Sequence, residues 1–142
     1  MKLLIVDDEK LTREGILKSL PLEKLGIHHT FMADDGVHGL EIALKEKPDL
    51  ILTDVRMPRM SGVEMAEEIL KSLPNAIILF MSAYSDKEYL KAAIKLKAVS
   101  YVEKPLDIEE LKQALGEAVE TRRTMSTHLA ASRSHEKEQL GH

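Results

Sequence analysis

The sequence has no cysteine among its 142 residues. Disulfide bonds, thiolate zinc sites and cysteine nucleophiles are therefore excluded. It also has no apolar run near the roughly 20 residues that a membrane-spanning helix needs. The first apolar run, Leu3–Val6, is too short for the core of a signal peptide, and acidic residues follow it directly. These absences predict a cytoplasmic protein with no membrane contact.

The sequence also has no excess of positive charge, because 20 lysine and arginine residues are outnumbered by 24 aspartate and glutamate residues, which gives a net charge of −4. A surface that binds nucleic acid needs clustered lysine and arginine, so we expect no direct nucleic-acid binding by this chain. Hydrophobic residues make up 44% of the sequence, which is enough for a packed core. The length suits one domain.

Short apolar runs alternate with helical patterns along the chain. The runs predict five strands, at Leu3–Val6, Thr30–Ala33, Asp49–Asp54, Ala76–Met81 and Val99–Glu103. Helical spacing predicts five helices, whose apolar faces are Leu11, Gly15, Ile16, Leu17 and Leu20; Val37, Leu40, Ala43 and Leu44; Val63, Ala66, Ile69, Leu70 and Leu73; Leu90, Ala93, Ile94 and Lys97; and Ile108, Leu111, Leu115, Ala118 and Val119. This alternation predicts an α/β fold, a doubly wound five-stranded parallel sheet with helices on both faces.

The last helical pattern runs on beyond the predicted domain. We expect a domain at residues 1–121 and, at 122–142, a helical extension, a linker or a non-native tail. Arg122, Met125 and Leu129 continue the helical stripe, so we expect the last helix to pass the domain and then fray. The stripe has too few apolar positions for a stable coiled coil, so we expect at most weak self-association through it.

Residues that carry chemistry follow four of the predicted strands. Asp7 and Asp8 follow the first strand, Asp54 ends the third, and Ser82 and Lys104 follow the fourth and fifth. In a parallel sheet these carboxyl ends share one edge, where ligands bind. Three converging carboxylates repel each other unless a cation neutralises them, and their oxygens suit Mg²⁺. A carboxylate held there can form an aspartyl phosphate, while an ammonium and a hydroxyl bind the phosphoryl oxygens.

Several of these segments together resemble the response-regulator receiver domain of two-component signalling. The resemblance is carried by Leu3–Glu9, Asp49–Pro58 with Ser61-Gly62, Met81–Tyr84 and Tyr101–Pro105, and it covers about residues 1–120. It implies a flavodoxin-like fold with strand order 2-1-3-4-5. It also implies a sensor histidine kinase as partner, an output domain, and a possible phosphorylation-dependent homodimer. Such a domain is a phosphoacceptor switch and not an enzyme.

The resemblance assigns a role to each matching residue. Asp54 corresponds to the phosphoacceptor, Asp8 to a direct Mg²⁺ ligand and Asp7 to its acidic neighbour. The metal set is completed by Asp54 and the backbone carbonyl of Arg56. Ser82 and Lys104 correspond to the phosphoryl-binding residues, and Tyr101 corresponds to the aromatic switch. The resemblance also implies a cis peptide bond between Lys104 and Pro105.

Two further positions bear on the lifetime of the phosphorylated state. In the family, the residues two after the phosphoacceptor and two after the switch hydroxyl flank the approach of water, and here they are Arg56 and Tyr84. Neither is a good base at neutral pH. We therefore expect them to slow dephosphorylation and to give a long-lived phosphoaspartate.

Several functions stay open on the sequence alone. Residues 8–15 and Leu25-Gly26 resemble receivers joined to AraC-type DNA-binding domains, so the output is expected to be transcriptional. A receiver that acts alone through protein contacts, with or without phosphorylation, is an alternative. A Mg²⁺-dependent phosphatase of the Asp-x-Asp type is disfavoured because Asp54 is followed by Val55 and Arg56.

Overall fold

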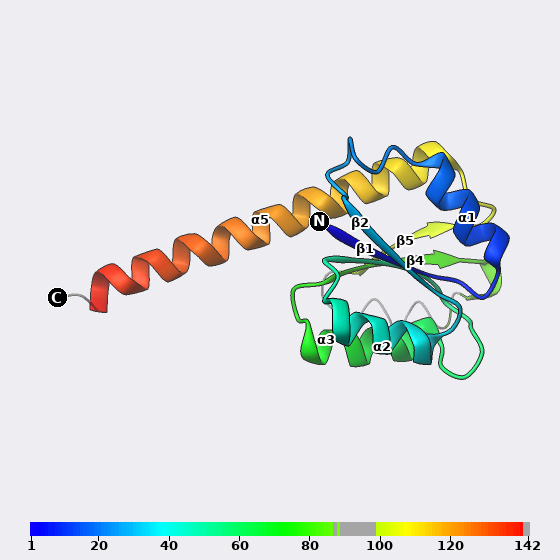
Figure 1. Ribbon diagram of the computed structural model, residues 1–142, viewed down its shortest axis with the longest axis horizontal. Coiled ribbons are helices and arrows are strands. Elements are labelled where there is room, and N and C mark those ends of the chain that lie inside the picture. Colours follow the sequence, from blue (N-terminus) through cyan, green and yellow to red (C-terminus); the bar gives the residue numbers. More distant parts are fainter. Residues whose placement is uncertain (87, 89–98, 141–142) are drawn as a thin grey trace.

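Five parallel strands form a single sheet in the computed structural model (Figure 1). The structure describes residues 1–86, 88 and 99–140; for Tyr84, Val99 and 126–140 it describes the backbone alone. The strands are β1 (Lys2–Val6), β2 (His29–Ala33), β3 (Leu50–Asp54), β4 (Ile77–Ser82) and β5 (Val99–Glu103). They lie in the order β2-β1-β3-β4-β5, so the expected order is confirmed. Each strand expected from the sequence is also confirmed, to within one residue at either end.

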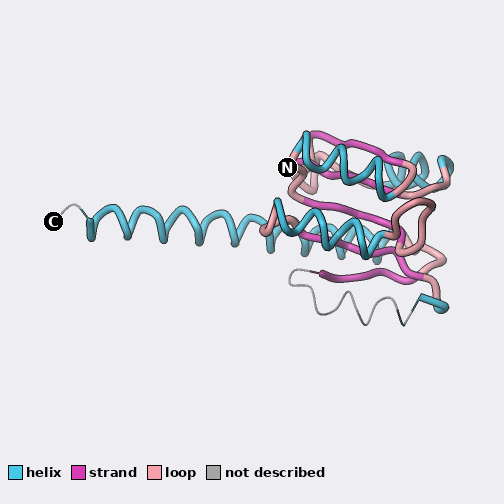
Figure 2. The backbone as a smooth tube through the Cα atoms, turned by 90° about the horizontal axis from the view of Figure 1, so that it is seen from below, coloured by secondary structure: helices cyan, strands magenta, loops and turns pink. Residues whose placement is uncertain are grey.

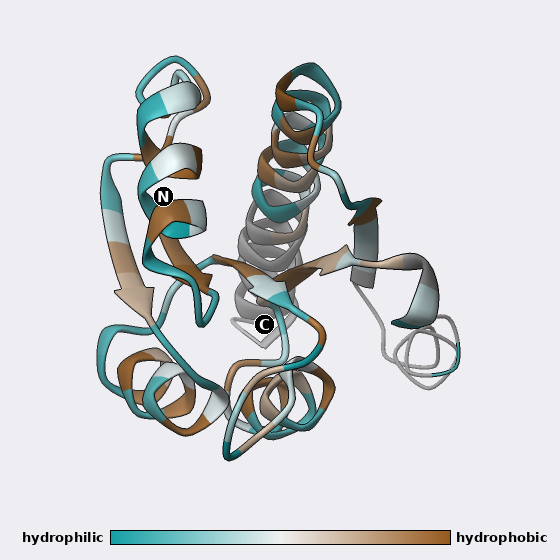
Figure 3. Ribbon diagram, turned by 90° about the vertical axis from the view of Figure 1, so that its right-hand side faces the viewer, coloured by the Kyte–Doolittle hydropathy of each residue, from teal (hydrophilic) through white to brown (hydrophobic). Residues whose placement is uncertain are grey.

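Helices cover both faces of the sheet, as expected, and Figure 3 shows the three layers. The described helices are α1 (Lys10–Ser19), α2 (Gly36–Glu46), α3 (Gly62–Ser72), the short 3₁₀ helix η1 (Tyr84–Asp86) and α5 (Ile108–Leu140). The helix expected around Leu90, Ala93, Ile94 and Lys97 lies outside the described residues.

The alternation of side chains along β1 divides the core into two clusters. Leu3 and Ile5 pack in the cluster that includes residues of α1 and α5. Leu4 and Val6 pack in the cluster that includes residues of α2 and α3. Successive side chains of a strand point to opposite faces, and both faces of this sheet are covered. The continuous apolar run of β1 is therefore explained, and it carries the acidic residues that follow it to the edge of a rigid sheet.

The apolar face expected for the first helix is partly wrong. Ile16 is buried, but Leu11 is 82% exposed and Gly15 is also exposed. Leu11 lies five positions before Ile16, which places the two about 140° apart around the helix axis. Leu44 of α2 is likewise 46% exposed, directly after the buried Ala43. These exposed leucines show that α1 and α2 bury narrower stripes than the sequence pattern predicted.

Helix α5 continues far beyond the sheet, as Figures 1 and 2 show. Arg122 Nη2 lies 3.4 Å from Asp49 Oδ1, and Met125 still packs against the core. The expected continuation of this helix beyond Val119 is therefore confirmed, but the helix reaches Leu140 where we had expected fraying. Among the described residues, no helix has both the length and the apolar character that crossing a membrane requires.

Candidate functional site

The strand register brings the expected site residues to one edge of the sheet. Val6 pairs with Thr53, so the residues that follow them, Asp7 and Asp54, lie side by side. Asp54 also pairs with Met81 of the next strand. Ser82 pairs with Glu103, which places Lys104 directly beyond the end of this ladder. Residues from four strands therefore meet at the carboxyl edge.

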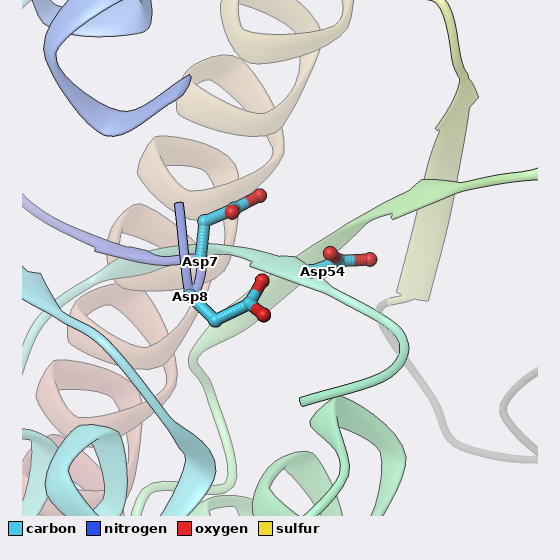
Figure 4. Close-up of side chains that lie close together, drawn as sticks. All are labelled: Asp7, Asp8 and Asp54. Carbon is cyan, nitrogen blue, oxygen red and sulfur yellow. The ribbon is translucent and has the colours of Figure 1, made fainter. Parts of the chain in front are cut away.

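Three carboxylates converge at this edge, as Figure 4 shows. Asp7, Asp8 and Asp54 each offer an oxygen, and these oxygens lie within 4.8 Å of one another. Asp7 is 1% exposed and Asp54 is 9% exposed, whereas Asp8 is open to solvent. The cluster is thus reached from the solvent on the side of Asp8.

The surroundings of Asp7 disfavour the ionised form of its carboxyl group. Burial raises the pKa of its carboxyl group, and a hydrogen bond from the Glu9 N–H to Oδ1, at 2.8 Å, opposes that rise. Repulsion by Asp54 and Asp8 raises the pKa further, and Lys104 lowers it. The net pKa is above the usual value. The buried Oδ2 atom has no hydrogen-bond partner among the described residues.

Lys104 is the cation that faces this cluster. Its Nζ atom donates a 2.9 Å hydrogen bond to Asp54 Oδ2 and lies 3.9 Å from Asp7 Oδ2. Burial by itself lowers the pKa of Lys104, but the hydrogen bond and charge of Asp54, with the charges of Asp7 and Glu9, outweigh it. The pKa of Lys104 is therefore raised, and the side chain stays cationic at neutral pH.

The donor set fits a divalent metal ion. The single positive charge of Lys104 does not balance the negative charges of the three carboxylates. In addition, the buried Asp7 Oδ2 atom is an acceptor without a hydrogen-bond partner among the described residues. Oxygen ligands at a partly open site are those that Mg²⁺ prefers. Asp7, Asp8 and Asp54 could therefore hold such an ion.

Other expected residues lie on β4, on β5 and in the segments directly after these strands. Ser82 is 2% exposed, and its hydroxyl donates a weak 3.5 Å hydrogen bond to the Val102 carbonyl. Tyr101 is 49% exposed, so its ring faces outward. The Lys104–Pro105 peptide bond is cis, as expected. The side chain of Tyr84, expected to act with Arg56, lies outside the described part of the chain.

Gly62 has a packing role that the sequence did not indicate. A Cβ atom at this position would collide with the carbonyl oxygen of Asp54, so only glycine lets α3 begin this close to the end of β3. Its φ angle is not positive, so a need for left-handed backbone is not the reason for glycine here. Gly62 therefore helps to position the segment that carries Asp54.

Sequence reasoning missed two ion pairs beside the site. Arg56 Nε lies 2.8 Å from Asp86 Oδ1, and Arg59 Nη2 lies 2.6 Å from Asp35 Oδ2. Asp35 also caps α2 by accepting from the His38 N–H, and this hydrogen bond and the Arg59 guanidinium lower the pKa of its carboxyl group. The partners are 30 and 24 residues apart, so no local pattern pairs them. For the pair of Arg56 and Asp86, the only hint in the sequence was that Asp86 lies four residues after the expected switch residue Ser82.

The family model for the response regulator receiver domain matches residues 3–116. Among curated proteins, the transcriptional regulatory protein HptR of Staphylococcus aureus is 36% identical over 120 residues, which is 84% of this chain and 47% of that protein. An uncharacterized response regulatory protein of Staphylococcus epidermidis is 39% identical over 114 residues, covering 80% of this chain and 45% of that protein. The chain thus spans about half the length of the curated relatives that it matches.

Two solved structures are similar over most of this chain. A two component transcriptional regulator AraC from Clostridium phytofermentans is 50% identical with a TM-score of 0.83, covering 87% of this chain and 96% of that chain. The REC domain of AraT, a response regulator from Geobacillus stearothermophilus, is 30% identical with a TM-score of 0.83, covering 88% and 97%. The sequence matches, the shared fold and the acidic edge agree with one another: this chain belongs to the family of response regulator receiver domains.

Proposed function

We propose that this domain accepts a phosphoryl group from a sensor histidine kinase on Asp54, with Mg²⁺ bound to Asp7, Asp8, Asp54 and the Arg56 carbonyl. Modification of Asp54 then changes the surface formed by the helix expected before β5, by β5 and by α5. That change controls an output domain. Membership of a phosphoacceptor family supports a switch and not a conventional enzyme.

The fixed orientation of its carboxylate carries the assignment of Asp54. Its Oδ2 atom accepts a 2.9 Å hydrogen bond from Lys104, and its Oδ1 atom accepts one from the Val55 N–H at 2.8 Å. The carboxylate is therefore held in one orientation at the end of β3, with a cation beside it. A carboxylate oxygen held in a fixed orientation is suited to nucleophilic attack on phosphorus.

The transfer itself needs few protein groups. An Asp54 oxygen forms a bond to the phosphorus as the phosphorus–nitrogen bond of the donor phosphohistidine breaks, and the departing imidazole keeps the electron pair and takes up a proton. Lys104 neutralises charge on the transferred group, and Ser82 supplies a hydroxyl to a second phosphoryl oxygen. A bound Mg²⁺ would offset the remaining negative charge.

The switch follows from the charge that phosphorylation adds, about −1.5 to −2 at neutral pH. Lys104 would exchange its bond to the free carboxylate for one to the phosphoryl group, and the Ser82 hydroxyl would leave its weak bond to Val102. Movement of Ser82 opens space beside β5, where the exposed Tyr101 can turn inward. In this proposal, the positions of Lys104, Ser82 and Tyr101 described above are those of the unphosphorylated form.

The output is proposed to be transcriptional. The curated relatives are about twice as long as the matched region, and HptR and the Clostridium phytofermentans protein are both described as transcriptional regulators. In this proposal, residues 1–121 form the receiver, and residues 122–142 contain a helical link, formed by the last part of α5, toward a DNA-binding domain. A phosphorylation-dependent homodimer through the switch surface would bring two such domains together.

Intact-mass spectrometry tests the assignment directly. Incubation with Mg²⁺ and acetyl phosphate is expected to add a single phosphoryl group, and the conservative variant Asp54→Asn is expected to remain unmodified. Asp8→Asn should retain Asp54 but slow the reaction markedly, because a carboxylate ligand is lost. Full labelling of Asp54→Asn would rule out Asp54 as the acceptor.

A matched control separates the site from general acidity of the surface. Asp34→Asn removes one exposed carboxylate that pairs with His38 and is not a member of the cluster of Asp7, Asp8 and Asp54. This variant is expected to be phosphorylated at the rate of the unmodified chain. Equal slowing in Asp34→Asn and Asp8→Asn would mean that net charge, and not the cluster, governs the reaction.

A further inference from the structure

An ion pair joins two loops across the proposed phosphorylation site. Arg56 lies in the loop after β3, two residues beyond Asp54, and its Nε atom is 2.8 Å from Asp86 Oδ1. Its Nη2 atom also donates to the Ser85 carbonyl at 3.2 Å. Ser85 and Asp86 belong to η1, the turn that begins two residues after Ser82. The guanidinium thus connects the strand that carries the acceptor with the strand that carries the hydroxyl.

Asp86 shapes that turn through both its side chain and its backbone. Its Oδ2 atom accepts a hydrogen bond from the Ala83 N–H at 2.8 Å, and its own N–H donates to the Ala83 carbonyl at 3.0 Å. Ala83 is the residue next to Ser82. Any displacement of Ser82 therefore acts on Asp86 through a closed and doubly hydrogen-bonded turn.

The two partners of the ion pair differ in burial, and this makes the pair persistent. The Asp86 side chain is 4% exposed, whereas the Arg56 side chain is 56% exposed. Asp86 Oδ1 has no aligned hydrogen bond among the described residues, so the charge of Arg56 is its main compensation. Without this partner the buried carboxylate would keep its hydrogen bond from the Ala83 N–H but would lose the opposite charge beside it, which is strongly unfavourable. Arg56 and Asp86 are therefore expected to move together and not to separate.

The other end of the same loop is held by a second arginine. Arg59 Nε donates to Asp35 Oδ2 at 2.7 Å, at the start of α2. A Cβ atom on Gly36 would collide with the Met60 carbonyl, so the loop lies directly against that helix. This end of the loop is therefore fixed on α2, whereas the Arg56 end is joined to η1.

We propose that Asp86 is a positioning residue of the phosphorylation site. It holds the Arg56 guanidinium on η1, so that the loop after Asp54 and the turn after Ser82 respond as one unit when Asp54 is modified. This proposal rests on the proposed function of Asp54 and adds to it a connection between the site and the turn after β4. Arg56 thereby acts through Asp86, and a change of Asp86 alters the response of the switch without removing any group that contacts the phosphoryl oxygens.

NMR with a phosphoryl mimic tests this connection. Beryllofluoride with Mg²⁺ is added to ¹⁵N-labelled protein, and the amide signals of Val55, Ala83 and Asp86 are followed. In the unmodified chain all three are expected to shift together. In Asp86→Asn and in Arg56→Gln, which keeps the backbone carbonyl, the Val55 signal should still shift. The shift of Ala83 should be clearly smaller, because η1 is no longer joined to the loop after Asp54.

The pair Arg59 and Asp35 provides the matched control. Arg59→Gln, in the same loop, and Asp35→Asn, at the start of α2, make the same changes of charge but do not touch η1. They are expected to leave the shift of Ala83 close to that of the unmodified chain. The proposal is overturned if Ala83 responds fully in both Asp86→Asn and Arg56→Gln, or if the control variants reduce its response equally.

A double variant separates coupling from local damage to the fold. Arg56→Gln with Asp86→Asn removes the buried charge together with its partner and can form a neutral hydrogen bond in its place. Its affinity for beryllofluoride is expected to differ by about threefold or more from the product of the two single effects. Additive effects contradict the connection. If the unmodified chain itself does not bind beryllofluoride, the proposed function of Asp54 fails, and this outcome differs from all the others.

The lifetime of the phosphoaspartate gives a second readout that a purely structural role would not change. If Asp86 positions Arg56 beside the approach of water, Asp86→Asn should change the decay rate after removal of acetyl phosphate. Asp86→Glu, which keeps the charge, should restore the rate toward that of the unmodified chain. An unchanged decay rate in Asp86→Asn, together with an unchanged Ala83 shift, contradicts the proposal.

Discussion

Leu4 in the middle of β1 and Asp7 directly after it are buried to nearly the same extent, at 0% and 1% exposure. Burial of a leucine side chain contributes roughly 1.5–3 kcal/mol to stability. Burial of a carboxylate opposes its ionisation, and it raises the pKa of Asp7. The same rigid strand thus carries stabilising residues and then a destabilising one. The stability of the sheet therefore holds the acidic cluster together.

Truncation of the buried Leu4 side chain is expected to change the stability of the domain more than any other change considered below. Leu4→Ala is expected to lower the free energy of unfolding by about 2–5 kcal/mol, because it leaves a cavity between the sheet and the α2–α3 layer. Urea denaturation followed by circular dichroism measures the loss. Ile5→Val on the other face serves as the mild control, with an expected loss of about 0.5–1.5 kcal/mol. A loss in Leu4→Ala no larger than in Ile5→Val would mean that the layers repack.

Removal of the charge on the buried Asp7 is expected to change the free energy of unfolding in the opposite direction. Asp7→Asn is expected to raise the free energy of unfolding of the metal-free protein by about 0.5–2 kcal/mol, at the expense of function. The pKa of Asp7 is raised above its usual value of 3.8, so the folded state binds this proton more tightly than the unfolded chain. Stability therefore falls as pH rises from about 3.8 through the folded-state pKa.

Denaturation at several pH values, with a chelator present, checks this sign. The difference between Asp7→Asn and the unmodified chain should be largest at neutral pH and should disappear at strongly acidic pH. Saturating Mg²⁺ should reduce the difference as well, because the metal stabilises the charged form. Destabilisation by Asp7→Asn in the metal-free protein would show that hydrogen bonding by Asp7 outweighs its desolvation.

The smallest expected effect concerns the two parts of α5. Deletion of residues 126–142 is expected to change the free energy of unfolding by no more than about 0.5 kcal/mol, because the backbone of this part of α5 extends beyond the sheet. Deletion from Arg122 onward should be worse, because it also removes the ion pair with Asp49 and the core contact of Met125. Thermal denaturation compares the two deletions. We also expect sedimentation to show at most weak self-association of the unphosphorylated chain, and a tight dimer lost on the longer deletion would contradict this.

The strands and the chemical residues could be predicted because both have local signals. Runs such as Leu3–Val6 are apolar on both faces only where helices cover both faces of a sheet. Once parallel strands are inferred, the convergence of Asp7, Asp54 and Lys104 follows from geometry. Local caps can be found in the same way, since Ser61 accepts from the Glu64 N–H three residues later.

Tertiary structure decided what depends on partners distant in sequence. Leu11 and Ile16 are both apolar, but only packing against the sheet and α5 determined that Ile16 is buried and Leu11 exposed. The pairing of Arg56 with Asp86 brings together two loops that follow different strands, and either residue alone is typical of a solvated surface. The periodicity, the order of the buried strands and the type of chemistry follow from the sequence, because they depend on neighbours along the chain. The orientation of each loop around Asp54 depends on long-range contacts, which exist only when the sheet has formed.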